Sequence, residues 1–251
     1  NPYLRAVHPV LDRYFCSGKS EVHRLDAENV PLNRITEVGM SQVDDVRAID
    51  EHSKDDSLSE IDVFGGKLDV FYAPQAGRPG TFTEQEKQKV ADSLVACADS
   101  NPDMTVFVKP HPNDSSPTLK AVVNDCETSN VHHLDATLSS LHCINAADIV
   151  VTKYSLVGFE AFLLNTPVLS IALDDPHWFE QYGDVAECFE DRSKMVEFIE
   201  NLLNHPDERD AWLADQQESI AKFVEENLLV TDDPNGRIVA EIVDALDRPE
   251  T

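Results

Sequence analysis

Short apolar runs rich in β-branched residues alternate along this chain with amphipathic helical segments. This alternation is typical of a parallel sheet whose strands are joined by crossover helices. The expected strands are Tyr14–Cys16, Ile35–Val38, Leu68–Tyr72, Thr105–Val108, Val131–His133, Asp148–Thr152, Val168–Ile171 and Ala186–Cys188. The expected helices include Thr83–Ala98, Leu156–Leu164, Arg192–Leu203, Asp207–Glu226 and Gly236–Leu246. The sequence therefore predicts an α/β fold in which a Rossmann-like parallel sheet forms the middle of three layers.

The segment Asp50–Gly66 is charged, rich in serine and closed by two glycines, so we expect an exposed loop or linker there. The residues before it hold two short expected strands, which are too few for a core of their own, so they belong to the main fold or are the tail of a missing domain. We therefore expect two regions. Residues 1–66 are a crossover segment and linker from a missing or truncated N-terminal domain, and residues 67–251 are the main Rossmann-like domain.

The chain carries 47 acidic and 20 basic residues, which gives a formal net charge of −27. A field of this sign repels phosphate backbones, so we expect no nucleic-acid partner. The acidic residues are spread along the chain, as in proteins kept soluble in high salt, where screening removes the self-repulsion. A salt-adapted protein in a high-salt cytoplasm is our leading hypothesis, and an ordinary acidic cytosolic protein is the alternative.

The sequence does not favour a membrane-spanning, a disulfide-stabilised or a metal-binding protein. No apolar stretch approaches the roughly 18–20 residues that a membrane-spanning helix needs, so we expect a cytoplasmic protein. The five cysteines are odd in number and share no short spacing. His132, His133, His142 and Cys143 fit no zinc spacing, and adjacent histidines on a strand point to opposite faces. We expect no metal and no cofactor.

The segment Val106–Asp114 is a strand that ends abruptly in polar residues and prolines. Open α/β sheets bind ligands at such strand ends. His111 lies between two prolines that fix the backbone on both sides, which suits an imidazole that donates to a phosphate or acts as an acid or base. A loop histidine satisfied by backbone carbonyls is the alternative. Lys109 adds a positive charge beside it, unless its side chain faces solvent.

The expected strand 148–152 also ends in polar residues, and a helix begins close behind it. Ser155 either caps this helix or joins its free amides in holding a phosphate. Thr152 and Lys153 flank the same position, and Lys153 is either a second phosphate contact or exposed. Gly158 costs helix stability, which is easiest to explain by the close approach of a ligand or a neighbouring strand. Glu160 has two acceptor oxygens that suit the hydroxyls of a ribose, but an ordinary exposed position on the polar side of the helix is the alternative that the sequence alone favours.

A third loop, Ala73–Gly80, joins the expected strand Leu68–Tyr72 to the helix that begins at Thr83. It contains glycines that allow it to cradle a phosphate or a base, but it lacks both the dinucleotide and the Walker patterns. Gln75, Gly77 and Arg78 are its candidate binding residues. A plain connecting loop is the alternative.

At these positions the chain resembles the C-terminal, nucleotide-binding half of a GT-B glycosyltransferase of the capsule and teichoic-acid type. The segments Lys109–Pro112, Thr152–Ala161 and Leu164–Val168 are similar to the HP and S/SS motifs of bacterial polysialyltransferases, Kdo transferases and CDP-glycerol glycerophosphotransferases. The segments Asp12–Lys19 and Ile35–Gly39 resemble the crossover from the N-terminal domain of such enzymes into the C-terminal one.

This resemblance implies roles for three residues. His111 is the catalytic residue and, with Ser155, contacts the phosphate of a CMP-, CDP- or UDP-activated donor, while Glu160 holds the ribose. The double serine of the polysialyltransferase motif is Tyr154-Ser155 here, which leaves the donor class open. The implied partners are a nucleotide-activated sugar or polyol and a glycan acceptor, for cell-surface polysaccharide synthesis. In this family an N-terminal Rossmann domain carries the acceptor site and usually the catalytic base, and such a domain allows peripheral association with the inner face of a membrane.

Two other functions stay open. A UDP-sugar 2-epimerase shares this architecture, although the Ser-Gly-Gly and paired glutamates of that class are not found near Ser155. A non-catalytic nucleotide-binding module is the third hypothesis.

Overall fold

A computed structural model describes residues 11–75, 83–114, 117–124, 126, 128–153, 155–173 and 179–247 of the chain. The chain forms two compact units. One contains the residues up to Arg47 together with those from Lys222 onward, and the other contains Ala48–Ala221. Each unit has its own set of packed elements and is described by itself.

The unit Ala48–Ala221 is built on a six-stranded parallel sheet with the strand order β5-β4-β3-β6-β7-β8. The strands are β3 (Leu68–Tyr72), β4 (Met104–Val108), β5 (Val131–His133), β6 (Ile149–Thr152), β7 (Val168–Ile171) and β8 (Glu187–Phe189). Strand β3 lies in the middle, where Val70 pairs with Val106 of β4 on one side and Ile149 of β6 on the other. The predicted α/β fold and each predicted strand of this sheet are confirmed, with ends that differ by one residue at most.

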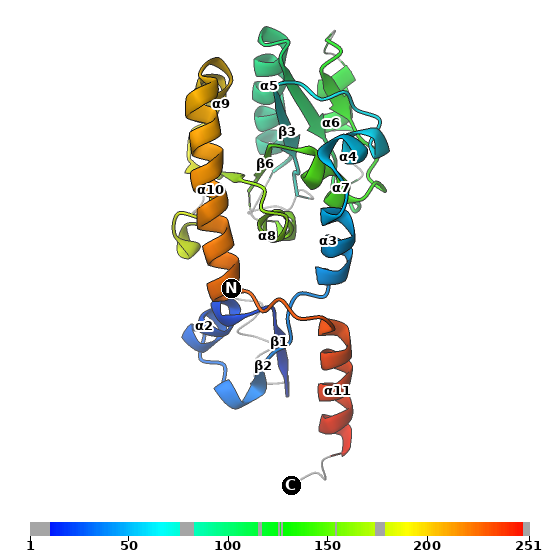
Figure 1. The fold of residues 1–251 in the computed structure, drawn as a ribbon, viewed down its shortest axis with the longest axis vertical. Coiled ribbons are helices and arrows are strands. Elements are labelled where there is room, and N and C mark those ends of the chain that lie inside the picture. The colour runs from blue at the N-terminus through cyan, green and yellow to red at the C-terminus, as the bar shows by residue number, and fades with distance from the viewer. Residues whose placement is uncertain are drawn as a thin grey trace. The chain divides into compact units, whose positions relative to one another are not determined.

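Helices cover both faces of this sheet (Figure 1). Helices α5 (Glu84–Ser100), α6 (Thr118–Asn124) and α9 (Arg192–Asn204) pack on one face. Helices α4 (Lys54–Glu60), α7 (Ser140–Ala146) and α8 (Leu156–Leu163) pack on the other. The short helix η3 (Phe179–Tyr182) follows β7, and α10 (Pro206–Asn227) follows α9. The three expected layers are therefore present.

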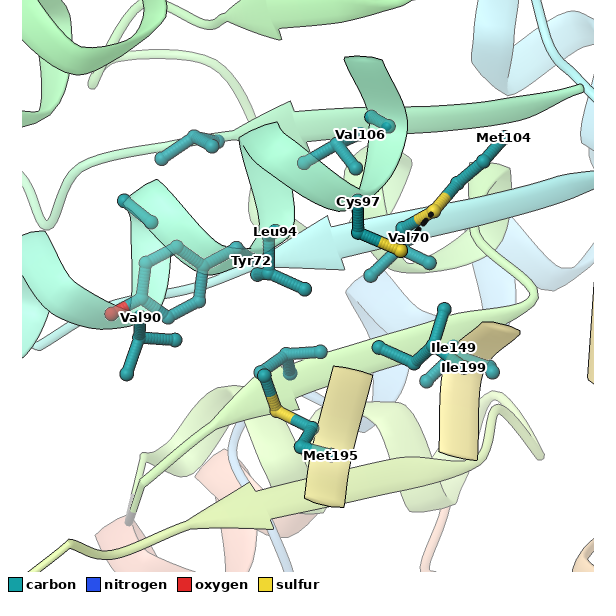
Figure 2. Packing of buried hydrophobic residues seen from close by; sticks show 14 of the residues in the cluster. Val70, Tyr72, Val90, Leu94, Cys97, Met104, Val106, Ile149, Met195 and Ile199 are labelled. Atoms are coloured by element: carbon teal, nitrogen blue, oxygen red, sulfur yellow. Dashed lines mark hydrogen bonds between the residues drawn. The ribbon is translucent and has the colours of Figure 1, made fainter. Parts of the chain in front are cut away.

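The main core lies between the sheet and the helices α5 and α9 (Figure 2). Alternate side chains of β3, including Val70 and Tyr72, point to this face and meet Val90 and Leu94 of α5. Helices α5 and α9 each bury an apolar stripe here, because residues three and four apart lie on one side of a helix. Met195 belongs to the stripe of α9. Burial of these apolar side chains, at about 25 cal/mol per Å², is the main force that holds the layers together.

The expectation of an exposed linker over Asp50–Gly66 is wrong, because this segment contains helix α4. Ser53 caps the helix and forms a capping box with Asp56, in which each side chain bonds the other residue's backbone N–H. Ser57 and Leu58 are buried, and α4 packs against α7. The unit boundary accordingly follows Arg47 and does not coincide with the expected division at Lys67. An N-terminal domain upstream of the chain stays a prediction.

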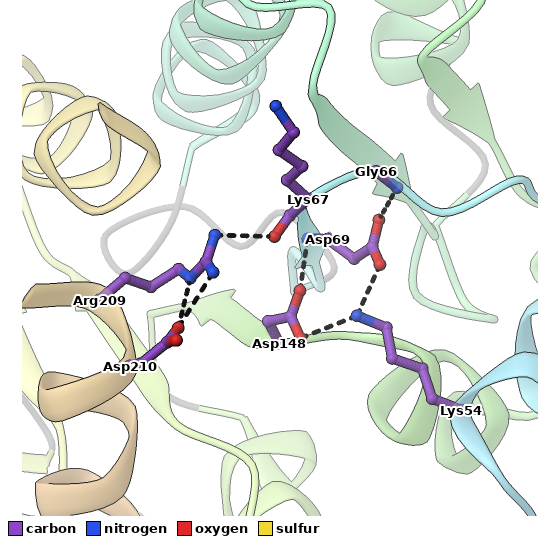
Figure 3. A network of polar contacts seen from close by, with 7 residues as sticks. All are labelled: Lys54, Gly66, Lys67, Asp69, Asp148, Arg209 and Asp210. Atoms are coloured by element: carbon purple, nitrogen blue, oxygen red, sulfur yellow. Dashed lines mark hydrogen bonds and ion pairs between the residues drawn. The ribbon is translucent and has the colours of Figure 1, made fainter. Parts of the chain in front are cut away.

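A polar network fixes α4 to the amino ends of β3 and β6 (Figure 3). The ammonium of Lys54 lies 2.6 Å from Asp69 Oδ2 and 2.8 Å from Asp148 Oδ1. The other Asp148 oxygen accepts the Asp69 backbone N–H at 2.8 Å, and Asp69 Oδ1 accepts the Gly66 N–H at 2.7 Å. Burial by itself lowers the pKa of Lys54, but the two carboxylates outweigh it and raise the pKa above its ordinary value. The charges at this end of the sheet are therefore satisfied within the protein.

The other unit contains a parallel pair of strands, β1 (Tyr14–Cys16) and β2 (Ile35–Glu37). Its helices are α2 (Lys19–Ala27), η2 (Leu32–Arg34), the start of α3 (Val43–Asp50), the end of α10 from Lys222 and α11 (Pro234–Asp247). Leu25 and Val30 pack on β1 in a small separate core. Among the described residues, every helix is too short or too polar to cross a membrane.

Candidate functional site

Sheet topology brings three loops together at one edge. The chain runs from β3 outward through β4 to β5, and then returns to the opposite side of β3 to form β6. The loops that leave the carboxyl ends of β4, β3 and β6 are therefore neighbours. Such a reversal of strand order opens a crevice between the loops, where doubly wound sheets bind ligands. The predicted candidates His111, Gln75 and Ser155 lie on these three loops.

His111 is partly exposed in the loop that follows β4. Its Nδ1 accepts the backbone N–H of Asn113 at 3.1 Å, and its carbonyl accepts the N–H of Asp114 at 2.8 Å. A neutral imidazole whose Nδ1 accepts a hydrogen bond carries its proton on Nε2. The ring is therefore held in a tautomer that leaves Nε2 as a donor, in contrast to a ring satisfied by backbone carbonyls.

Sequence reasoning missed the pair that anchors this loop. Lys87 of α5 is fully buried, and its ammonium contacts the carboxylate of Asp114 and, at 2.6 Å, that of Glu84. Lys87 lies three residues after Glu84 on the helix, a spacing that the sequence does reveal. Its contact with Asp114 joins residues far apart in the chain and had no local signal.

Lys109 is buried, with 5% of its surface exposed. No hydrogen bond or ion pair of its ammonium is found within the described part of the chain. Burial lowers its pKa, while the nearby Cys143, Glu160 and Asp135 act in the opposite direction. The alternative that Lys109 faces solvent is therefore wrong. A buried cation without a direct partner is costly, and an anion at this position removes that cost.

Glu160 of α8 is partly buried close to this ammonium. Burial raises its pKa, and the charge of Lys109 lowers it by a smaller amount. The side chain is therefore not an ordinary exposed position on the polar side of α8. Lys109 and Glu160 bring opposite charges to the same edge from two different elements.

Lys153 lies at the end of β6 and is 2% exposed, so the alternative of an exposed side chain is wrong. Its ammonium is 3.6 Å from Glu86 Oε1 on α5. The other oxygen of Glu86 accepts the backbone N–H of Thr83 at 2.6 Å, within the predicted capping box of α5. The first turn of α5 therefore contacts the loops after both β4 and β6, through Lys87 and Glu86.

Thr152 has a structural role. Its side chain is fully buried, and its hydroxyl donates to the carbonyl of Ala73 at 2.9 Å. The backbone N–H of Ala73 in turn donates to the carbonyl of Val151 at 2.9 Å. These bonds hold the ends of β3 and β6 together beneath the loops, and the proton of the Thr152 hydroxyl is used there.

Ser155 is the N-cap of α8. Its Oγ accepts the N–H of Val157 at 3.3 Å, and its carbonyl accepts the N–H of Gly158 at 3.0 Å. Two of the amides at the start of this helix are thus satisfied by Ser155 itself. Among the described residues, the hydroxyl proton of Ser155 meets no acceptor, so it can donate to a ligand.

Gly158 is explained by packing and not by the approach of a ligand. A Cβ on this residue would lie 2.4 Å from Cζ of Phe179, well inside van der Waals contact. The ring of Phe179 also contacts Phe159 and Phe162 of the same helix. The prediction named a ligand or a neighbouring strand as the close neighbour of Gly158, whereas the structure places an aromatic side chain of η3 there.

Gln75 follows β3, and its Oε1 is buried without a hydrogen-bond partner among the described residues. Buried acceptors are nearly always paired, so this oxygen is suited to a donor supplied by a ligand. Gly77 and Arg78 lie outside the described residues.

His132 and His133 lie on β5, which pairs with β4. His132 and His133 border an open cavity of about 540 Å³, together with Asp62 and Asn124. Within the described ranges, no group of three or more His, Cys, Asp or Glu side chains is arranged to hold a metal ion.

The sequence profile of the UDP-N-acetylglucosamine 2-epimerase family matches residues 5–240. Comparison with curated proteins gives no match.

Solved structures with the same fold include the Staphylococcus aureus protein MnaA with UDP (TM-score 0.68, 16% identity) and the Neisseria meningitidis UDP-GlcNAc 2-epimerase bound to UDP-GlcNAc (0.67, 16%). The wall teichoic acid polymerase TagF, in a variant soaked with CDPG, also matches (0.63, 15%). The match to MnaA covers 96% of this chain and 61% of that protein, and the match to the N. meningitidis epimerase covers 96% and 63%. The match to TagF covers 97% of this chain and 60% of that protein. At this identity the likeness establishes the fold alone, which is Rossmann-like and of the GT-B kind.

Proposed function

This chain belongs to the UDP-N-acetylglucosamine 2-epimerase family, and we propose that it binds the diphosphate of a nucleotide-activated sugar at the strand ends of β3, β4 and β6. The observation that carries the proposal is the buried ammonium of Lys109, which lacks a hydrogen-bonded or ion-paired partner in the described chain. Lys109 lies two residues before His111, at the edge where the strand order reverses and where doubly wound sheets bind ligands.

Charge supports an anionic ligand here. The chain has a net charge of −27, yet three of its lysines are buried at this one edge. Lys87 is balanced by Asp114 and Glu84, and Lys153 has Glu86 nearby. Lys109 is left as the cation whose charge is best matched from outside the protein. Phosphate oxygens supply both the charge and the acceptors that an ammonium needs.

The remaining candidates fit other parts of such a ligand. His111 Nε2–H and the Ser155 hydroxyl are donors for phosphate oxygens. Glu160 accepts from ribose hydroxyls, and Lys109 favours its ionised form. The unpaired oxygen of Gln75 requires a donor, which a phosphate lacks, so it suits an N–H of the base or a sugar hydroxyl.

Binding is tested by calorimetry with UDP, UDP-GlcNAc, CDP and CMP. We expect Lys109→Met to weaken binding of the preferred diphosphate at least about tenfold, the loss typical of a charge-assisted hydrogen bond. Lys67→Met is the matched control, because Lys67 pairs with Asp103 at the opposite end of β3 and is exposed. Equal affinity of the wild type and Lys109→Met would defeat the proposal.

Two reactions suit this site, and both build negative charge on a departing nucleotide that the buried cations and His111 stabilise. Family membership favours 2-epimerisation of a UDP-activated amino sugar. The likeness to TagF in fold, with the segment Lys109–Pro112, favours transfer from a CDP-activated donor to a glycan acceptor. Ser155 is followed by Leu156 and Val157 and not by two glycines, which departs from the epimerase pattern.

An NMR assay separates the two reactions. Incubation with UDP-GlcNAc yields the 2-epimer if the chain is an isomerase. Release of CDP or CMP from a CDP-activated donor that depends on an acceptor identifies a transferase, with CDP left by transfer of a glycosyl group and CMP left by transfer of a phosphorylated polyol. Binding without either reaction is the outcome expected of a nucleotide-binding module, or of a site whose catalytic base lies on an N-terminal domain. A glycan acceptor and a peripheral membrane location belong to the transferase hypothesis alone.

A further inference from the structure

Residues 111–114 form a tight turn after β4 that is closed by two hydrogen bonds. The carbonyl of His111 accepts the backbone N–H of Asp114 at 2.8 Å, and its Nδ1 accepts the N–H of Asn113 at 3.1 Å. Pro112 is the second residue of this turn, where a φ fixed at about −65° is favoured. The orientation of the imidazole therefore depends on where the backbone of Asn113 and Asp114 is held.

The turn is tied to neighbouring elements on both sides. Before it, the backbone N–H of Lys109 donates to the carbonyl of Tyr72 on β3 at 3.2 Å. At its end, the carboxylate of Asp114 contacts the ammonium of Lys87 in the first turn of α5. Both of these side chains are buried, so water screens their attraction only weakly. The first tie is made by backbone atoms, whereas the second is made by side chains and can be removed by substitution.

Charge balance does not account for Asp114. Lys87 also lies 2.6 Å from the carboxylate of Glu84, three residues earlier on the same helix. One carboxylate is enough to neutralise one ammonium, so Asp114 brings the group of three to a formal net charge of −1. A surplus negative charge on a loop that binds an anion opposes that binding. A role in holding the turn explains why this carboxylate is placed there.

We propose that Asp114 is a positioning residue for His111. Held by Lys87, it fixes the turn in which Nδ1 accepts the Asn113 N–H, so that Nε2 keeps the proton that is donated to a phosphate oxygen of the ligand. The inference rests on the proposed function, from which the phosphate is taken. A turn released from Lys87 lets the imidazole adopt the other tautomer, whose Nε2 is an acceptor and therefore finds no partner on an ionised phosphate.

The charge of Asp114 and its hold on the turn act on an anionic ligand with opposite signs. Asp114→Asn removes the charge with little change of shape, and an uncharged amide holds the Lys87 ammonium less strongly. If only the charge mattered, this variant would bind an anion more tightly than the wild type. We expect it to bind about three- to tenfold more weakly, the loss that one uncharged hydrogen bond gives.

Glu84→Gln is the matched control. It removes one negative charge from the same lysine, but from the helix and not from the turn. Its affinity for an anion should equal that of the wild type or exceed it by up to about threefold. Lys87 keeps one carboxylate in each variant, so neither change leaves a buried cation unpaired. Asp114→Ala, which removes the contact altogether, is a second variant with the same expected direction as Asp114→Asn.

The test measures the affinities for UDP and inorganic pyrophosphate by calorimetry, and the tautomer of His111 by nitrogen-15 NMR. His111→Ala identifies the signals of this ring. We expect the proton on Nε2 in the wild type and in Glu84→Gln, and a mixture of tautomers in Asp114→Asn. In the background of His111→Ala, Asp114→Asn should no longer weaken binding, because the two residues act through one another.

The results separate this inference from the proposed function. UDP binding by the wild type, with equal or tighter binding by Asp114→Asn, overturns the inference and leaves the proposed function standing. An unchanged tautomer in both Asp114 variants also overturns it. A changed tautomer in these variants, without UDP binding by the wild type, supports the hold of Asp114 on His111 and defeats the proposed function.

Discussion

The ammonium of Lys87 on α5 lies against the carboxylate of Asp114, the residue that follows the His111 turn. Both side chains are buried, with 0% and 4% exposure. The pair connects the first turn of a core helix to the loop that presents His111. The position of His111 is therefore set partly by a residue that sequence reasoning did not single out.

Removal of this anchor should destabilise the protein. Lys87→Met leaves the carboxylates of Asp114 and Glu84 without their buried cation, and we expect a loss of about 3 kcal/mol in the free energy of unfolding. Urea unfolding followed by circular dichroism measures the change. Lys67→Met, in an exposed pair with Asp103, should change stability by less than about 0.5 kcal/mol. Equal effects of the two variants would contradict the anchoring role.

Ligand binding at Lys109 should take up protons at alkaline pH. Burial lowers the pKa of this lysine in the ligand-free protein, and a bound diphosphate favours the charged form and raises it again. Between these two pKa values the free protein is partly deprotonated and the complex is protonated. Uptake should therefore grow as pH rises from neutral, which calorimetry in buffers of different ionisation enthalpy measures.

Lys109→Arg is the control for this linkage. Arginine keeps the positive charge but does not titrate in this range, so the variant should bind without alkaline proton uptake. Identical uptake in the variant and the wild type would assign the proton to another group.

Gly158→Ala should destabilise the protein through Phe179. The added methyl group would lie 2.4 Å from Cζ of the ring, and such overpacking costs about 1–3 kcal/mol. Replacing the ring with a smaller side chain, in Gly158→Ala with Phe179→Leu, should restore part of the loss. If the double variant shows only the sum of the two separate losses, the contact with Phe179 is not the reason for the glycine.

The charge of the chain predicts a dependence on salt. Three of the ten lysines are buried, so the surface is poorer in cations than the composition suggests. We expect the melting temperature to rise by several degrees between low salt and about 2 M sodium chloride, because screening reduces repulsion among acidic side chains. Chloride is used because sulfate stabilises most proteins by exclusion. A melting temperature that does not respond to salt would contradict salt adaptation.

Local patterns were enough to predict most of the fold. The strands of the main sheet follow from β-branched runs, and the start of α5 follows from the capping box of Thr83 and Glu86. Ser155 was likewise found as a helix start. These signals depend on neighbours in sequence, and so they can be read without tertiary contacts. Helix α4 also had such a signal, Ser53 with Asp56, but its charged and serine-rich composition obscured it.

The sequence by itself determined which residues stand at the ends of the strands, and therefore which residues are candidates for the site. The tertiary structure alone decided the burial and the partners of these residues. Lys109 and Lys153 are buried, Lys87 holds Asp114, and the ring of Phe179 accounts for Gly158. The physical reason is that burial and charge pairing depend on groups brought together by strand order and helix packing. Such partners lie far apart along the chain, where no local spacing records them.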